Sequence, residues 1–292
     1  MIEIGDRLNN RYHITNKISH GGMADIYEAY DSVGRRVVAI KILREEMMAD
    51  PANIARFERE CVATSSLYNP NIVSVYDHGE IDGHPYMVNE FVKGQTLREK
   101  LNFSASGTLP VSEACNVIKQ VCEVVDYIHK HGLVHRDIKP ENLFYSVDGT
   151  VKISDFGIST TIGEKQKGDS ISGTVHYSAP EILMGKPSMP SADIYSIGIL
   201  FYEILVGHPP FIAATPEEVA IKQIKEPISL PSEQRSDVPK RLDNIIVKAT
   251  RKRPEERYRS AAAMKAALEK AISEEGDIKE KKGLFARIFG FK

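Results

Sequence analysis

Tryptophan is absent from this chain of 292 residues, and cysteine occurs only three times. Cys61, Cys115 and Cys122 form no CxxC pair, so the sequence does not support a disulfide scaffold or a zinc ribbon and favours a reducing compartment. An excess of one charge is also absent, because 38 basic and 40 acidic residues give a net charge of −2. This balance argues against a domain that binds nucleic acid through a basic surface.

Long hydrophobic runs are missing as well. The first residues do not combine a basic region with an apolar one, so export by a signal peptide is not expected. The most apolar stretch, Ile194 to Val206, is shorter than the roughly 20 residues of a membrane span and predicts a helix buried in a core. The expected location is cytoplasmic. With 42% apolar and 27% charged residues, the composition is that of a globular protein.

The first part of the chain has the pattern of β-structure. Residues 10–45 contain strand-like segments broken by glycine turns, and Val37 to Leu43 is rich in β-branched residues. Asp50-Pro51 predicts the start of a helix, since Asp suits the N-cap and Pro the first turn. Two further strands are expected over Ile72 to Tyr76 and Tyr86 to Val92.

Helical spacing dominates after Gly94. From Ala114 to Ile128 apolar residues recur every three or four positions, and Gly132 fits the end of that helix. Further helices are expected at 191–206, 216–225, 240–249 and 260–272. The sequence therefore predicts a β-rich part and a larger helical part joined by a hinge near 90–94, an arrangement that often places a ligand in a cleft.

Two features of the β-rich part suit a nucleotide. Gly21 and Gly22 lie in a turn between strands, where backbone N–H groups can approach phosphate oxygens; an ordinary hairpin turn is the alternative. Lys41 ends the apolar strand Val38-Ala39-Ile40 and suits the α- and β-phosphates, with Glu60 as the carboxylate that would hold it. An exposed lysine at a strand end and a surface glutamate are the alternatives for this pair.

Three segments decide between these alternatives. His135-Arg136-Asp137-Ile138-Lys139-Pro140-Glu141-Asn142 is followed by Asp155-Phe156-Gly157 and then by Ala179-Pro180-Glu181. With the glycine turn and Lys41, they match the kinase motifs in type and order. From about residue 10 to 272 the chain resembles the protein kinase family. The glycine turn and Lys139, two residues after Asp137, are similar to those of bacterial, eukaryotic-type (Hanks-type) serine/threonine kinases.

The resemblance implies an α+β bilobal protein kinase fold. Its small β-rich N-lobe would span residues 1–91, with the phosphate loop, Lys41 and the helix of Glu60. The larger α-helical C-lobe would span 92–274, with the catalytic loop, the activation segment and the shelf for the peptide substrate. Residues 275–292 would form a basic amphipathic tail.

The resemblance also implies the roles of individual residues. Asp137 would orient the substrate hydroxyl and Lys139 would neutralise charge on the transferring phosphoryl group. Asn142 and Asp155 would bind Mg²⁺, or Mn²⁺ in its place. The other residues expected to bind ATP are Ile18, Ser19, His20, Gly21, Gly22, Met23, Ala24, Asp25, Ile26, Ala39, Lys41, Glu60, Glu90 and Val92, of which Glu90 and Val92 would offer backbone groups to adenine.

Several residues are expected to support this machinery. By the same resemblance, Asp193 would anchor the backbone of the catalytic loop, Glu181 would pair with Arg257, and Thr174 would contact the catalytic loop beside the substrate. Arg136 would receive an activating phosphate, for which Ser170 and Ser172 are candidates. Simple surface flexibility is the alternative explanation for this Ser/Thr-rich segment.

The sequence departs from the family pattern at three positions. Ser19 and Ala24 stand at the first and third glycine positions of the phosphate loop, which puts the flexibility of that loop in question. Asn89 stands where a larger apolar residue is common, and its amide needs a hydrogen-bond partner if it is buried.

The tail, residues 279–292, carries five basic residues and one acidic residue. Its apolar residues fall on one face of a helix, at Leu284, Phe285, Ile288 and Phe289. This pattern is typical of a segment that binds weakly to a membrane surface, here the inner face of the membrane. Docking on the kinase surface and a disordered end are the alternatives.

The predicted function is transfer of the ATP γ-phosphate to serine or threonine hydroxyls of proteins, including the chain itself, by a non-specific serine/threonine protein kinase. Two alternatives are a pseudokinase that binds nucleotide as a scaffold and a kinase of small molecules. Expected partners are protein substrates, a second copy of the chain during autophosphorylation and a counteracting phosphatase, with no nucleic acid.

Overall fold

The computed structural model describes residues 2–156, 160–161 and 175–273. The chain divides into two compact units. The first comprises residues 1–96 and 142–160, and the second comprises 97–141 and 161–292. The first unit therefore includes a later stretch of the chain, of which Phe144, Tyr145 and Ser146 pair with a strand at 94–96.

The first unit is built on a six-stranded antiparallel sheet in the order β1-β2-β3-β4-β6-β5. A three-stranded sheet in the order β10-β9-β7 belongs to the same unit. The strands are β1 (Arg7–Leu8), β2 (Tyr12–His20), β3 (Ala24–Asp31), β4 (Arg36–Leu43), β5 (Val75–Ile81), β6 (His84–Glu90), β7 (Gly94–Thr96), β9 (Leu143–Ser146) and β10 (Val151–Ile153).

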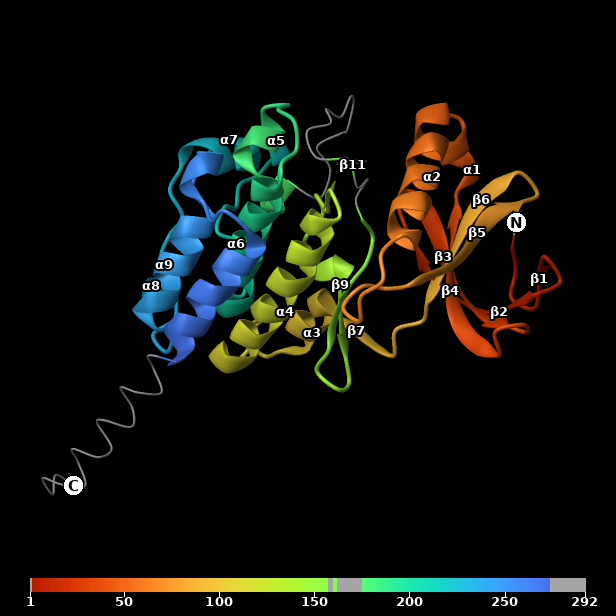
Figure 1. Ribbon diagram of the computed structural model, residues 1–292, viewed down its shortest axis with the longest axis horizontal. Coiled ribbons are helices and arrows are strands. Elements are labelled where there is room, and N and C mark those ends of the chain that lie inside the picture. Colours follow the sequence, from red (N-terminus) through yellow and green to blue (C-terminus); the bar gives the residue numbers. More distant parts are fainter. Residues whose placement is uncertain (1, 157–159, 162–174, 274–292) are drawn as a thin grey trace, which may run out of the picture. The chain divides into compact units, whose positions relative to one another are not determined.

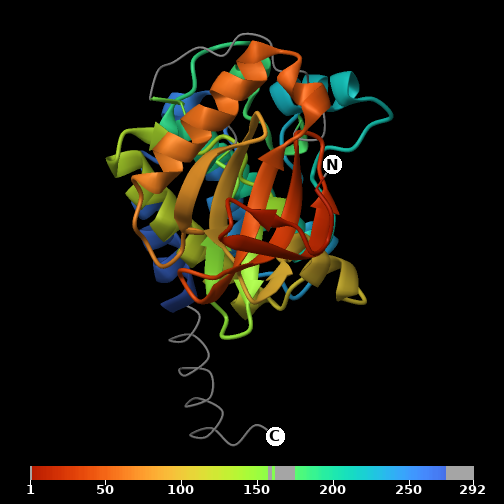
Figure 2. The same ribbon diagram turned by 90° about the vertical axis from the view of Figure 1, so that its right-hand side faces the viewer.

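Helices α1 (Glu45–Met48) and α2 (Pro51–Ser65) follow β4. Asp50 is the N-cap of α2, as its sequence predicts, and its side chain accepts a hydrogen bond from the backbone N–H of Ala52. Helix α2 packs on β5 and β6, and Figures 1 and 2 show it along one face of the large sheet. Phe57 and Cys61 of α2 form an apolar cluster with Leu43 and Met87 of the sheet.

Two predicted strands differ in the structure: β6 spans His84–Glu90 instead of Tyr86 to Val92, and the strand expected over Ile72 to Tyr76 starts later. Residues 72–74 are not part of the large sheet, and β5 begins at Val75. The backbone there is used elsewhere: Ile153 donates to the carbonyl of Asn71 and accepts from the N–H of Val73, and Ile72 forms a parallel bridge with Ile153. Residues 71–73 therefore connect the end of β10 to the first sheet.

The second unit is helical. Its elements are α3 (Leu97–Phe103), α4 (Val111–Lys130), β8 (Leu133–Val134), η1 (Pro140–Asn142), whose last residue belongs to the first unit, η2 (Val175–Tyr177), α5 (Pro180–Leu183), α6 (Pro190–Val206), α7 (Pro216–Lys225), α8 (Pro231–Gln234), α9 (Lys240–Ala249), η3 (Pro254–Glu256) and a helix over 261–273, with the short strand β11 (Thr160–Thr161) at the boundary between the units.

Helix α6 is the centre of the second unit, as its apolar sequence predicts. Fourteen of its residues are buried, and it packs on α4, α8, α9, η2 and η3 (Figure 1). Gly198 permits this packing, because a Cβ there would lie 2.7 Å from Thr250 Cγ2 and 2.9 Å from Ala249 Cβ. No helix among the described residues is long and apolar enough to cross a membrane.

The predicted pair of Glu181 and Arg257 is present. The guanidinium donates to both carboxylate oxygens, at 2.6 and 2.7 Å, and also to the carbonyl of Ser191. The Arg257 side chain is fully buried. Removing one partner of such a pair strands the other as an unpaired buried charge.

We therefore expect Arg257→Met to lower the free energy of unfolding by about 3–5 kcal/mol. Arg253→Met is the matched control, since the Arg253 side chain is 69% exposed in its pair with Glu255 and should change stability by less than about 1 kcal/mol. Urea denaturation followed by circular dichroism measures both. Equal losses in the two variants would contradict the assignment.

Candidate active site

Strand register places four residues of the site on one face of the large sheet. Side chains alternate between faces along a strand, so Ala39 and Lys41 of β4 share a face. Ala39 lies opposite Asn89 of β6, and Lys41 lies opposite Met87. This is the face on which α2 packs, whereas Val38, Ile40 and Ile42 enter the core on the other face.

Lys41 is held between two carboxylates of the first unit. Its Nζ donates to Glu60 Oε1 of α2 at 2.9 Å and to Asp155 Oδ1 at 2.7 Å. The Lys41 and Glu60 side chains are only 14% and 8% exposed. The predicted partnership with Glu60 is therefore present, and Asp155 is a second partner of Lys41 that the sequence did not predict.

The charge of Lys41 is stabilised by this arrangement. Burial alone lowers the pKa of a lysine, because the ammonium loses hydration. Here the two carboxylates outweigh burial, so the pKa of Lys41 is raised above its ordinary value. Lys41 is therefore a permanent cation at neutral pH, suited to binding phosphate and unsuited to acting as a base.

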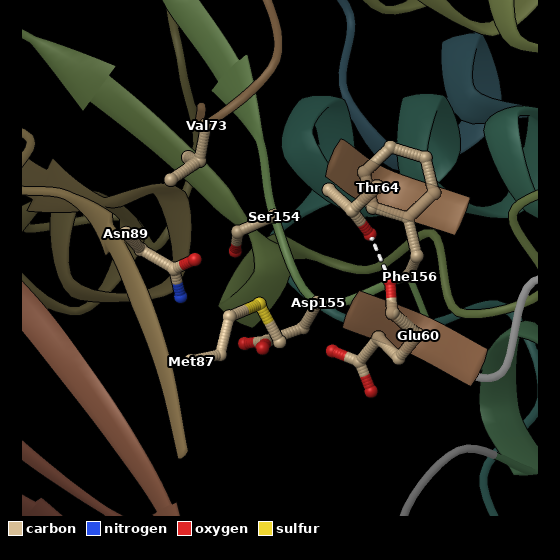
Figure 3. A pocket seen from close by; sticks show the side chains of 8 residues that line it. All are labelled: Glu60, Thr64, Val73, Met87, Asn89, Ser154, Asp155 and Phe156. Carbon is tan, nitrogen blue, oxygen red and sulfur yellow. Dashed lines mark hydrogen bonds between the residues drawn. The ribbon is translucent and has the colours of Figure 1, made fainter. Parts of the chain in front are cut away.

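A small pocket lies beside this cluster (Figure 3). Asn89 lines it together with Met87, Val73, Thr64, Glu60, Ser154, Asp155 and Phe156. The amide of Asn89 is directed into the pocket, opposite the Thr64 side and near Ser154. The pocket thus combines apolar walls with polar groups that can form hydrogen bonds, as in many ligand sites.

Asn142 and Asp155 are brought together by the β9–β10 pair. Leu143 pairs with Ile153, and one step further the N–H of Ser154 donates to the carbonyl of Asn142 at 2.9 Å. Asp155 follows with φ of +47°, an uncommon backbone conformation for a residue other than glycine. An amide oxygen and a carboxylate are ligands suited to Mg²⁺, so these two residues fit a divalent metal.

Charged side chains connect the two strands beside the phosphate loop, through contacts that the sequence did not predict. Asp25 accepts from Lys17 Nζ at 2.9 Å and lies 2.6 Å from His20 Nδ1. Burial raises the pKa of Asp25, but the bonds from Lys17 and His20 outweigh it and lower that pKa overall. Gly21 is required for close approach, because a Cβ there would lie 2.8 Å from the carbonyl oxygen of Ala24.

The hinge residue Glu90 has more contacts than predicted. Its backbone N–H donates to the carbonyl of Ser74 at 2.8 Å, and its carboxylate accepts from Lys152 Nζ at 3.0 Å. These bonds fix the end of β6 to the residue before β5 and to β10 of the three-stranded sheet. The contacts of Glu90 and Val92 with adenine stay a prediction.

In the second unit, Asp137 and Lys139 lie on one loop. Lys139 Nζ donates to Asp137 Oδ2 at 2.7 Å, and the N–H of Asp137 donates to His135 Nδ1 at 3.3 Å. Arg136, which lies between His135 and Asp137, has φ of +70°. Such a conformation is uncommon and often marks a functional loop.

The buried carboxylate of Asp193 holds this loop, as predicted. It accepts from the backbone N–H groups of His135 and Arg136 and is bonded to His129 Nε2, each at 2.8 Å. Burial raises the pKa of Asp193, and these partners outweigh burial, so its pKa is lowered. The loop is thereby fixed to α6.

Polar side chains of α6 and α7 bind the backbone of residues 175–177. Ser196 of α6 donates to the carbonyl of Tyr177 at 2.8 Å, and Gln223 of α7 donates to the carbonyls of Val175 and His176. Ser196 and Gln223 were missed as site residues, because they are far from the segment in sequence. Ser170, Ser172 and Thr174 lie outside the described residues.

Cysteine chemistry is not supported. All three cysteines are buried, and no disulfide links them to one another. Burial raises the pKa of Cys61, beside Glu60, to about 12, so its thiol stays protonated and is a poor nucleophile.

Comparison with known proteins supports one family. The protein kinase domain matches residues 12–268. The chain is 40% identical to the serine/threonine-protein kinase PrkC of Bacillus subtilis over 92% of its length and 39% identical to a probable serine/threonine-protein kinase PknB of Lactococcus lactis over 90%. It spans only 42% of each of those proteins.

A solved structure agrees with these relatives. The crystal structure of the kinase domain of Mycobacterium tuberculosis PknI, determined as a double mutant, matches 92% of this chain and 98% of its own with a TM-score of 0.76 and 25% identity. The family uses ATP, a divalent metal and protein substrates. The chain belongs to the protein kinase family, among relatives that are bacterial serine/threonine kinases of the Hanks type.

Proposed function

We propose that this chain transfers the γ-phosphate of ATP to serine and threonine hydroxyls of proteins, itself included. The observation that carries the proposal is the buried Lys41, held by both Glu60 and Asp155. In this family the lysine–glutamate pair and the metal-binding aspartate must both be in place for phosphotransfer.

The roles follow from the chemistry of each group. Lys41 would bind the α- and β-phosphates as a fixed cation. Asp137 would accept a hydrogen bond from the substrate hydroxyl and orient its oxygen toward the γ-phosphorus, and the proton would leave through that carboxylate. Lys139, which is bonded to Asp137, would compensate negative charge on the transferring group.

Asn142 and Asp155 would hold Mg²⁺, and Mn²⁺ could replace it. The metal would neutralise phosphate charge. Among the described residues no group of three or more His, Cys, Asp or Glu side chains could hold a metal ion on its own. Two protein ligands plus substrate phosphates are the usual arrangement for Mg²⁺ in such sites.

The geometry favours turnover over the two alternatives. A pseudokinase scaffold would not need Asp137 fixed by Asp193 through His135 and Arg136, yet the second unit has these bonds. A kinase of small molecules would not need the segment before Ala179 to be held at successive carbonyls, as it is by Ser196 and Gln223.

Regulation is proposed from residues outside the described part of the chain. Phosphates on Ser170 and Ser172 would pair with Arg136 and order the activation segment. A second copy of the chain would add these phosphates during autophosphorylation, and a phosphatase would remove them. Mass spectrometry after incubation with ATP tests this, and a chain with no phosphate on either serine would argue against it.

The tail, residues 279–292, is proposed to bind weakly to the anionic inner face of the cell membrane. Its basic residues contribute about 1 kcal/mol each near such a surface. Co-sedimentation with anionic vesicles should be stronger for the full chain than for one ending at Glu280, and equal pelleting of the two would exclude this role.

We expect Asp137→Asn to lower phosphotransfer by about 10²–10⁴-fold, because the hydroxyl loses its acceptor. Asp155→Asn should have a similar effect through loss of a charged metal ligand. Asp148→Asn, an exposed turn residue, is the matched control and should retain activity. Transfer from labelled ATP with Mg²⁺ measures all three, and unchanged autophosphorylation in Asp137→Asn would contradict the assignment.

We expect Asn89→Met to weaken ATP binding by about 2- to 10-fold, the value of one hydrogen bond, since the amide is directed into the pocket beside Lys41. The exposed substitution Asn102→Met should have no effect. Titration with ATP measures affinity, and thermal denaturation should show little change in stability. Identical affinity in both variants would show that Asn89 does not reach the nucleotide.

A further inference from the structure

Arg98 makes three hydrogen bonds to three different elements of the second unit. From α3, its Nε donates to Glu141 Oε1, its Nη1 to Glu203 Oε1 and its Nη2 to the hydroxyl of Tyr177, each at 2.8 Å. A guanidinium can do this because its donors form a rigid planar fork. A lysine could not reproduce the same three directions.

The cluster is buried at one end and exposed at the other. The Glu203 side chain is 2% exposed, Arg98 29% and Glu141 45%. Tyr177 also donates to the second oxygen of Glu203. Burial alone would lower the pKa of Arg98, but Tyr177 and Glu203 raise it above its ordinary value, so the cation is permanent and balances the buried carboxylate.

The elements joined by Arg98 are those that phosphotransfer to a protein must align. Glu141 belongs to the catalytic loop, two residues after Lys139 and one before Asn142. Tyr177 belongs to η2, which Ser178 separates from Ala179-Pro180. Helix α6, which carries Glu203, also carries Asp193 and Ser196, the anchors of the same loop and segment.

We propose that Arg98 is a positioning residue that fixes the catalytic loop relative to the substrate-facing segment 175–177. The inference rests on the proposed function and adds to it the residue that connects these two parts. Arg98 acts through Glu141 and Tyr177 rather than on the reacting atoms, and misplacement of reacting groups by about 1 Å can cost roughly 100-fold in rate.

The test compares Arg98→Ala with Lys100→Ala. Lys100 lies on the same helix and pairs with Glu113, so the control removes an ion pair from α3 without touching the cluster. We expect Arg98→Ala to lower kcat/KM for a protein substrate by about 10- to 100-fold. The Kd for ATP should stay within about twofold, because Lys41, Glu60 and Asp155 belong to the first unit.

Two further measurements separate positioning from stability. Guanidinium chloride at millimolar concentration should restore part of the Arg98→Ala activity by occupying the vacated place, whereas sodium chloride at equal concentration should not. Arg98→Lys should remain well below the activity of the unaltered chain, because it keeps the charge and loses the fork. Glu141→Gln combined with Arg98→Ala should be no worse than Arg98→Ala alone, since coupled residues are non-additive.

Full activity in Arg98→Ala would overturn the proposal. So would a loss that guanidinium does not reverse, or one accompanied by an equal loss of ATP affinity, because either would mean general damage to the fold. Failure of the proposed function would appear differently, as absence of phosphotransfer in the unaltered chain.

Discussion

The ion pairs of Lys41 are the interaction on which the first unit depends. A buried ammonium is costly unless it is paired, and a carboxylate buried alone is equally so. Glu60 and Asp155 come from segments far apart in the chain, and both end at this one cation. Lys41 therefore connects the large sheet, α2 and the residue that follows β10. A bound triphosphate would add negative charge at this point, beside the two carboxylates.

In the second unit, carboxylates on the central helix bind groups from other segments. Helix α6 is mostly apolar and is buried on all sides, so it forms the core of the second unit. Several of its polar residues bind loops: Asp193 binds His135 and Arg136, Ser196 binds Tyr177, and Glu203 binds Arg98 and Tyr177. A rigid helix therefore supplies the positions of groups whose own backbone is irregular, such as Arg136 with its positive φ.

Local patterns explain what could be predicted. Asp50-Pro51 and Pro216 mark helix starts through capping and a fixed φ, and the apolar run of α6 could only be buried. The motifs around Asp137 and Asp155 could be read as a candidate site because each motif is contiguous in the sequence. The start of β5 was wrong, since whether residues 72–74 join the sheet depends on Ile153, which lies far along the chain.

The family resemblance implied the pair of Glu181 and Arg257, but other pairs between distant residues had no such signal. Arg98 and Glu203 are 105 residues apart, and nothing near either one indicates the other. The same holds for Gln223 and the carbonyls of Val175 and His176. Lys17 and Asp25 are only eight residues apart, but their spacing alone does not show that an ion pair would connect the two ends of the loop.

The hold of Asp193 on two backbone amides has a consequence for hydrogen exchange. The N–H groups of His135 and Arg136 donate to a carboxylate with no exposed surface. Exchange of an amide requires its hydrogen bond to open, and here opening means separating the loop from the central helix. These two amides should therefore exchange as slowly as those of α6, so that a catalytic loop has the protection of a core element.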